Sequence, residues 1–177
     1  MKKPPDAVEV FLTPGEFRFE TGSTRFRTIL GSCVAVTWWH PLRKIGGMCH
    51  FMLPCRLRKG TELDGKYADE AFELFVRNAK THNTQPGEYQ MKLFGGGEMF
   101  PKHRRDSSSS NVAEMNVIAA QQLAANYQWD LVAHDMGSTG HRNIIFDLWS
   151  GHVWVRHKPM KIVAEGADEK NKGSGRR

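Results

Sequence analysis

The chain has 177 residues, 40% of them hydrophobic and 25% charged, which is typical of a globular domain and excludes a low-complexity or fibrous protein. No apolar run reaches the roughly 18 residues that span a bilayer, and the first residues lack the apolar core of a signal peptide. Three cysteines are too few for a disulfide scaffold. We therefore expect a cytoplasmic protein with no membrane insertion. The net charge of +6 suits an acidic partner, but the sequence carries no nucleic-acid-binding motif, so nucleic acid is not expected.

The first half of the chain favours strands followed by one helix. Residues 8–12 and 16–20 alternate apolar with polar side chains, as half-buried strands do. Residues 33–39 and 45–53 are more continuously apolar, which indicates central strands. Apolar residues at helical spacing then predict a helix over 66–80.

The second half adds one helix and several strands. Residues 88–94 alternate again and lead into three glycines at 95–97. Asn111 is a predicted cap for a second helix. The predicted apolar side of that helix consists of Val112, Met115, Ala119, Leu123 and Asn126. Residues 129–136, 143–149 and 152–157 are typical of three further strands.

These elements predict an α+β layered fold in a single domain, with some eight strands and two helices. Residues 1–163 form that domain in this interpretation. Residues 164–177 contain almost no apolar side chains, so we expect a disordered tail there. Removing the tail is expected to leave folding unchanged.

A hairpin within this pattern brings together two side chains that are able to take part in catalysis. A four-residue loop over 40–43, with Pro41 at its second position, would join the two central strands. Counting back from that loop places Cys33 directly opposite His50. Residues opposed in this way share one face of the sheet.

A thiol beside an imidazole is an arrangement that can perform nucleophilic catalysis. A free cysteine is only a few per cent thiolate at neutral pH, and a neighbouring histidine can take its proton. This predicts a lowered pKa for Cys33, while Cys49 points away from His50. The alternative is that Cys33 is a small buried hydrophobe and His50 a structural side chain.

Several motifs around these residues resemble those of one protein family. They are LGSCVAV at 30–36, GGMCHFMLP at 46–54, YADEAFELF at 67–75, KLFGGGEMF at 92–100, NVIAAQQL at 116–123 and DMGSTGHR at 135–142. In this order they resemble the CheD family, the chemoreceptor glutamine deamidases of bacterial chemotaxis. The similarity covers about residues 12–156. Departures include Ser138, where a glycine is expected, and Met115, where a charged residue is usual.

The resemblance implies hydrolysis of receptor glutamine side chains to glutamate and ammonia. It assigns the nucleophile to Cys33, the histidine to His50 and the third catalytic residue to Thr28. It also implies a three-layer α/β/β sandwich, similar to the catalytic domain of the cytotoxic necrotizing factors. The chemistry needs no metal and no organic cofactor. Backbone N–H groups at Gly31, Ser32 or Cys33 are candidates for stabilising the oxyanion.

Partners also follow from the resemblance. The cytoplasmic domains of chemoreceptors (methyl-accepting chemotaxis proteins) are the implied substrates, and a CheC-type phosphatase is a possible partner. A second hypothesis keeps these partners without turnover, as a catalytically weak adaptor that binds chemoreceptors or the phosphatase. An activity assay of a Cys33→Ala variant separates the enzyme from the adaptor.

Overall fold

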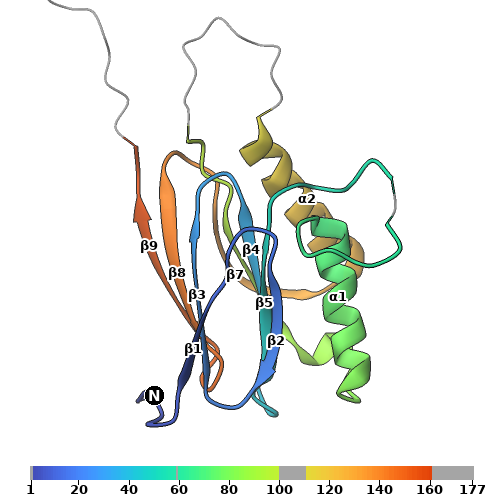
Figure 1. Ribbon diagram of the computed structural model, residues 1–177, viewed down its shortest axis with the longest axis vertical. Helices are drawn as coiled ribbons and strands as arrows, with labels where there is room; N and C mark the ends of the chain where they lie inside the picture. The colour runs from blue at the N-terminus through green and yellow to red at the C-terminus, as the bar shows by residue number, and fades with distance from the viewer. Residues whose placement is uncertain (1, 59, 100–110, 161–177) are drawn as a thin grey trace, which may run out of the picture.

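The computed structural model describes residues 2–58, 60–99 and 111–160, which form two β-sheets and a layer of helices (Figure 1). The predicted disordered tail, 164–177, lies outside these residues. In the described ranges the strands are β1 (Val8–Phe11), β2 (Phe17–Thr21), β3 (Thr24–Leu30), β4 (Val34–His40), β5 (Ile45–Phe51), β6 (Gln90–Gly95), β7 (Asp130–Met136), β8 (His141–Asp147) and β9 (His152–Lys158). The helices are α1 (Ala68–Thr81), a short 3-10 helix η1 (Pro86–Glu88) and α2 (Val112–Tyr127). None of them is long and apolar enough to cross a membrane.

The strands divide into a four-stranded sheet, in the order β1-β3-β8-β9, and a five-stranded sheet, in the order β2-β5-β4-β6-β7. Helices α1 and α2 cover one face of the five-stranded sheet, and the four-stranded sheet covers its other face (Figure 1). The predicted layered domain is therefore confirmed, with the five-stranded sheet as the middle layer.

Two apolar cores lie on the two faces of this middle layer. Because side chains alternate along a strand, β4 sends Trp38 to the helix side and Ala35 to the other sheet. Trp38 stacks on Tyr89 and Trp129 in the helix-side core. The core between the sheets consists of Leu12, Phe26, Leu30, Ala35, Met48, Phe94, Ile144, Phe146 and Leu148. Both faces of the middle layer are thus buried, which explains the continuously apolar sequence of β4 and β5.

Strand β3 was missed by the sequence analysis, which assigned no element to residues 24–30. It pairs with β1 in parallel and with β8 in antiparallel orientation. Thr24, Phe26, Thr28 and Leu30 are buried, and the residues between them face outward. The alternation was present in the sequence, but two arginines and two threonines obscured it. The strand matters because it carries Thr28 into the space between the sheets.

The β4–β5 hairpin also differs from the prediction. His40 pairs with Ile45, so the loop comprises residues 41–44 rather than 40–43. Lys44, the last residue of the loop, has a left-handed φ of 52°. Lysine rarely adopts this conformation, so the sequence does not indicate it. His50 consequently lies opposite Ala35, not opposite Cys33. The error is two residues, so the alternation of faces is preserved.

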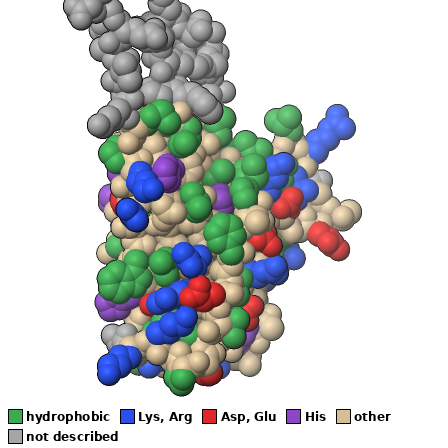
Figure 2. All heavy atoms as spheres, turned by 60° about the vertical axis from the view of Figure 1, so that its left-hand side comes forward, with side chains coloured by type: hydrophobic (Ala, Val, Ile, Leu, Met, Phe, Trp, Pro, Cys, Tyr) green, Lys and Arg blue, Asp and Glu red, His purple; other side chains and the backbone are tan. Residues whose placement is uncertain are grey.

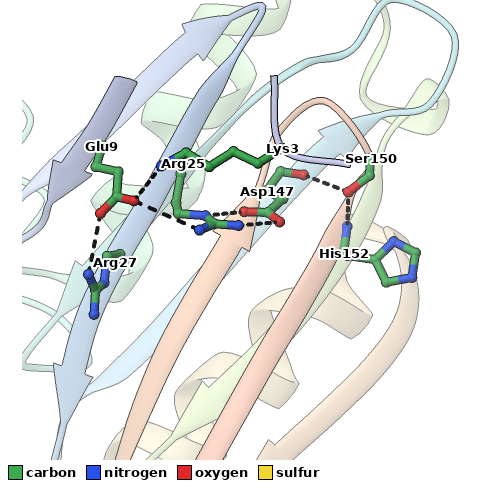
Figure 3. Close-up of polar contacts among 7 residues, drawn as sticks. All are labelled: Lys3, Glu9, Arg25, Arg27, Asp147, Ser150 and His152. Carbon is green, nitrogen blue, oxygen red and sulfur yellow. Dashed lines mark hydrogen bonds and ion pairs between the residues drawn. The ribbon is translucent and has the colours of Figure 1, made fainter. Parts of the chain in front are cut away.

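Charged side chains on the outer face of the four-stranded sheet link three of its strands, β1, β3 and β8 (Figure 3). The guanidinium group of Arg25 donates to both oxygens of Asp147 on β8, at 2.6 and 2.9 Å. Glu9 on β1 accepts from Lys3 at 2.9 Å and from Arg27 at 3.3 Å. Acidic and basic side chains gather at one end of this face, and apolar ones are spread across its middle (Figure 2). These ion pairs hold β1 and β8 on either side of β3.

Candidate active site

The three residues assigned by the resemblance come from two different sheets. Thr28 lies on β3 of the four-stranded sheet and His50 on β5 of the five-stranded sheet. Cys33 lies in residues 31–33, which connect β3 to β4 and so pass from one sheet to the other. Cys33 packs against the core between the sheets. The three residues therefore share the interface between the two β-layers.

Thr28 and His50 form a hydrogen-bonded pair across that interface. Thr28 Oγ1 and His50 Nδ1 are 2.8 Å apart, and Thr28 Oγ1 also donates to the carbonyl oxygen of Leu12 at 2.8 Å. A hydroxyl has one hydrogen to donate, and a carbonyl oxygen only accepts. The ring must therefore carry its hydrogen on Nδ1. The tautomer leaves a lone pair on Nε2, which is buried and has no hydrogen-bond partner among the described residues.

Cys33 is a diagonal neighbour of His50 rather than its direct partner. Val34 pairs with Phe51 and Ala35 with His50, so Cys33 precedes the ladder on the same face as His50. Diagonal Cα atoms lie about 7–8 Å apart, which longer side chains still bridge. The structure records no hydrogen bond between the Cys33 thiol and His50 within the described residues.

Burial keeps both groups neutral. It lowers the pKa of His50 to about 4, against which a hydrogen bond with the Leu12 backbone and the charge of Glu16 act more weakly. Burial also raises the pKa of the Cys33 thiol, and a hydrogen bond with Ser32 partly offsets this. The predicted lowering of the Cys33 pKa is therefore wrong, because desolvation disfavours the thiolate. The resting pair is a thiol and an imidazole, not an ion pair.

The segment that carries Cys33 is held by its carbonyl groups. Gly97 N–H donates to Gly31 O at 2.8 Å, and Gly96 N–H donates to Cys33 O at 2.7 Å. Gly95, with a φ of 110°, lies so close that a Cβ there would come within 2.3 Å of the Cys33 oxygen. Within the described residues, no hydrogen bond from the N–H of Ser32 or Cys33 is recorded. The N–H groups of Ser32 and Cys33 thus differ from the carbonyl groups of Gly31, Ser32 and Cys33, all of which accept a hydrogen bond.

Comparison with known proteins identifies the family. A family model described as "CheD chemotactic sensory transduction" matches residues 52–157. The chain belongs to the CheD family. The matched region begins just after His50, so it contains none of Thr28, Cys33 and His50.

Curated CheD relatives align with most or all of the chain. One from Pseudomonas savastanoi pv. phaseolicola is 59% identical over 97% of each chain, and one from Pseudomonas fluorescens is 58% identical over 100% of each. A more distant one from Leptospira interrogans is 36% identical over 86% of this chain and 95% of its own. All three are named "Probable chemoreceptor glutamine deamidase CheD", the last with the suffix 1. These alignments extend over far more of the chain than the family-model match does.

The other two cysteines of this CheD chain are placed differently from Cys33. Cys49 is buried in the helix-side core, where its thiol donates to Gly65 O at 3.2 Å. Burial raises the pKa of the Cys49 thiol. The expectation that Cys49 points away from His50 is confirmed. Cys55 is exposed, which makes it a suitable control for any experiment on Cys33.

Sequence reasoning missed the role of Asn116, because the predicted apolar side of α2 was only partly right: Ala119 and Leu123 do pack against the helix-side core, but the fully buried side is a neighbouring one. The buried residues of that helix are Ala113, Asn116, Ala120 and Ala124, while Val112 and Met115 are 40% and 43% exposed. Small alanines let the helix approach the sheet closely. Asn111 does cap the helix as predicted, accepting from Ala113 N–H at 3.0 Å. An asparagine amid small apolar residues was the available signal for Asn116.

Metal ligation was not expected in this CheD chain. In the part of the chain that the structure describes, no group of three or more His, Cys, Asp or Glu side chains could hold a metal ion. Asp135 binds the buried guanidinium group of Arg142, with Oδ1 at 2.8 Å from Nη2. That ion pair ties β7 of one sheet to β8 of the other.

The buried state of His50 predicts a pH-dependent stability. The unfolded chain takes up a proton on His50 below its usual pKa of 6.5, whereas the native protein does so only near pH 4. Stability is therefore lost as the pH falls through this window, by about 1.4 kcal/mol per pH unit at most. Between pH 7 and pH 5, His50 should account for a loss of about 2 kcal/mol in the free energy of unfolding.

Urea unfolding of the wild type and of a His50→Gln variant at both pH values measures this loss. The variant should lose about 2 kcal/mol less than the wild type on acidification. A His152→Gln variant, changed at an exposed strand position, should behave as the wild type. Equal losses in the wild type and His50→Gln would contradict the buried, neutral assignment of His50.

Proposed function

We propose that this protein hydrolyses the side-chain amides of particular chemoreceptor glutamines to glutamate and ammonia, with Cys33 as the nucleophile. The observation that carries the proposal is the Thr28–His50 hydrogen bond of 2.8 Å. It leaves a basic nitrogen free on the same side of the sheet as a thiol. The printed names of the CheD relatives supply the substrate class.

Nucleophile activation in this proposal takes place during the attack. The resting thiol is neutral, and its pKa is raised by burial. His50 Nε2 takes the proton as the sulfur bonds to the glutamine carboxamide carbon. The imidazolium that forms is stabilised by the hydrogen bond from Nδ1–H to Thr28, which is the place of the third group in a catalytic triad.

The remaining steps complete the hydrolysis. The tetrahedral adduct collapses, the C–N bond breaks, and His50 returns its proton to the departing nitrogen, so that ammonia leaves. The thioester on Cys33 is then attacked by water, which His50 deprotonates. As the C–S bond breaks, His50 returns this proton to the sulfur, which regenerates the thiol and leaves glutamate. Every proton is accounted for by His50 and water, so no metal or organic cofactor is needed.

The oxyanion of each tetrahedral adduct requires hydrogen-bond donors. We assign this role to the N–H groups of Ser32 and Cys33, within the predicted region that begins at Gly31. The carbonyl groups that share peptide planes with these N–H groups are those of Gly31 and Ser32. They accept from Gly97 N–H and from Asn116 Nδ2, and these two bonds fix the planes. Each donor of this kind contributes about 3–4 kcal/mol to transition-state stabilisation where it has been measured.

We infer a cytoplasmic protein whose domain comprises residues 1–163, with a fold similar to the cytotoxic necrotizing factor catalytic domain. We infer chemoreceptor cytoplasmic domains as substrates and a CheC-type phosphatase as a further partner. Support comes from the sequence motifs and from the three-layer arrangement, in which Cys33 lies between β3 and β4 where the chain passes from one sheet to the other.

Incubation of the protein with a purified cytoplasmic chemoreceptor fragment tests the function. Ammonia release is measured together with glutamine-to-glutamate conversion by peptide mass spectrometry. The wild type should convert specific glutamines, and Cys33→Ala should convert none. Cys55→Ala, which removes an exposed thiol, should retain full activity.

Each contrary outcome has a distinct meaning. Conversion by Cys33→Ala at the wild-type rate would remove Cys33 from the mechanism. Stable binding of the fragment by the wild type without any conversion would instead support the adaptor hypothesis. Loss of activity in Cys55→Ala would show that the nucleophile has been assigned to the wrong thiol.

A further inference from the structure

Asn116 joins the two segments that carry the proposed nucleophile and base. Its side-chain nitrogen Nδ2 lies 3.0 Å from the carbonyl oxygen of Ser32 and 2.8 Å from that of Met52. Ser32 directly precedes Cys33, and Met52 follows His50 by two residues. Asn116 belongs to α2, in the helical layer, so these contacts link that layer to the two segments at the end of the β4–β5 ladder.

The position of these two contacts is significant because the β4–β5 ladder ends there. Val34 and Phe51 are the last paired residues of the ladder at this end. Beyond them, Ser32 and Met52 leave the sheet, and no strand hydrogen bond holds them together. The amide group of Asn116 bridges the two segments that contain Ser32 and Met52, at the point where backbone pairing stops.

The chemistry of the amide suits this bridge. An asparagine NH2 group has two hydrogens, and each is directed to one carbonyl oxygen. Asn116 is fully buried, so water does not compete for the two bonds. Leaving a buried carbonyl oxygen without a donor costs free energy. This cost favours the arrangement in which Asn116 donates to both carbonyl groups.

We propose that Asn116 is a positioning residue, which sets the separation of Cys33 and His50 by holding the carbonyl groups of Ser32 and Met52 together. The proposal rests on the assignment of Cys33 and His50 as the reacting pair. It predicts an effect on the rate of the chemical step rather than on substrate capture, because the buried Asn116 side chain donates its hydrogen bonds to backbone carbonyl groups of this chain.

The test compares Asn116→Ala with a matched control, Asn78→Ala. Asn78 is a half-buried helix residue whose Nδ2 donates to a single backbone oxygen, Leu74 O, at 2.8 Å within α1. Both changes remove an asparagine side chain from a helix and replace it with the best helix former. Only Asn116→Ala releases the two segments of the site.

We expect Asn116→Ala to lower kcat on a receptor fragment by about 100-fold, the size expected for a misplacement near 1 Å. KM should stay within about threefold, because no substrate contact is removed. Asn78→Ala should leave both constants near the wild-type values. Circular dichroism at the assay temperature confirms that each variant is folded.

Hydrogen exchange gives a second measurement that needs no substrate. Peptides containing Ser32, Cys33 and Met52 should exchange at least about tenfold faster in Asn116→Ala, as expected for local opening. The same peptides should be unchanged in Asn78→Ala.

The outcomes separate the inference from the function it rests on. Unchanged exchange at Ser32 and Met52, or a kcat loss no larger than that of Asn78→Ala, would overturn the positioning role. A fall in kcat/KM that arises entirely from KM would also overturn it. A wild type that releases no ammonia would refute the proposed function instead, while faster exchange would still support the bridge.

Discussion

A His50→Gln variant should lose turnover on a chemoreceptor fragment by about 10²–10⁴-fold, the usual contribution of a general acid–base group. Glutamine fills similar space and still exchanges a hydrogen bond with Thr28, but it cannot take the thiol proton or return it to ammonia. The loss should appear in kcat, measured by ammonia release, because His50 acts on the reacting atoms.

His40 provides a matched control for that change. His40 and His50 are 2% and 1% exposed and lie on neighbouring strands of the same sheet, but at opposite ends. A His40→Gln variant should therefore incur a similar cost of altering a buried imidazole while keeping its activity. If both variants lost turnover equally, or if His50→Gln retained it, His50 would not be the base.

Thr28→Val should reduce kcat by about 10²-fold or more, by analogy with triads whose orienting group is lost. Valine matches the shape of threonine but removes the hydroxyl that His50 Nδ1 contacts and that donates to Leu12 O. The ring would then be free to place its hydrogen on Nε2, which leaves no lone pair for the thiol. The kcat of purified, folded protein on the receptor fragment measures the effect.

Two companion variants define what the Thr28 result means. Thr28→Ser keeps the hydroxyl and should recover most of the wild-type rate. Thr37→Val removes the hydroxyl of an equally buried threonine on β4 and should leave kcat unchanged. A Thr28→Val enzyme with wild-type kcat would show that the Nδ1 tautomer does not depend on this hydroxyl.

The layers of the fold could be predicted from the sequence, but not the pairing that builds the site. Alternating and continuous apolar runs identified most strands, and the resemblance supplied the three-layer arrangement. The alternation in β3 was overlooked because Arg25 and Arg27 dominate its composition, although both are satisfied by ion pairs with Glu9 and Asp147. Such pairs are visible only once distant strands are brought together.

The register of the hairpin could not be predicted either, because it depends on the backbone conformation of Lys44. The residue type does not predict a positive φ at a lysine. The prediction of a shared face nevertheless survived, since an error of two residues preserves alternation. The raised pKa of Cys33 was also missed, because burial between two sheets is a tertiary property.

Because Thr28 and His50 lie on separate sheets, the distance between the sheets determines how closely the two side chains approach each other. Packed sheets lie about 10 Å apart, and here that gap is set by side chains such as Phe26, Met48 and Phe146. Dense packing passes small changes in volume on to neighbouring atoms. A substitution in this core can therefore shift the histidine relative to its threonine without touching either residue. The hydrophobic core between the sheets acts in this sense as a spacer for the proposed active site.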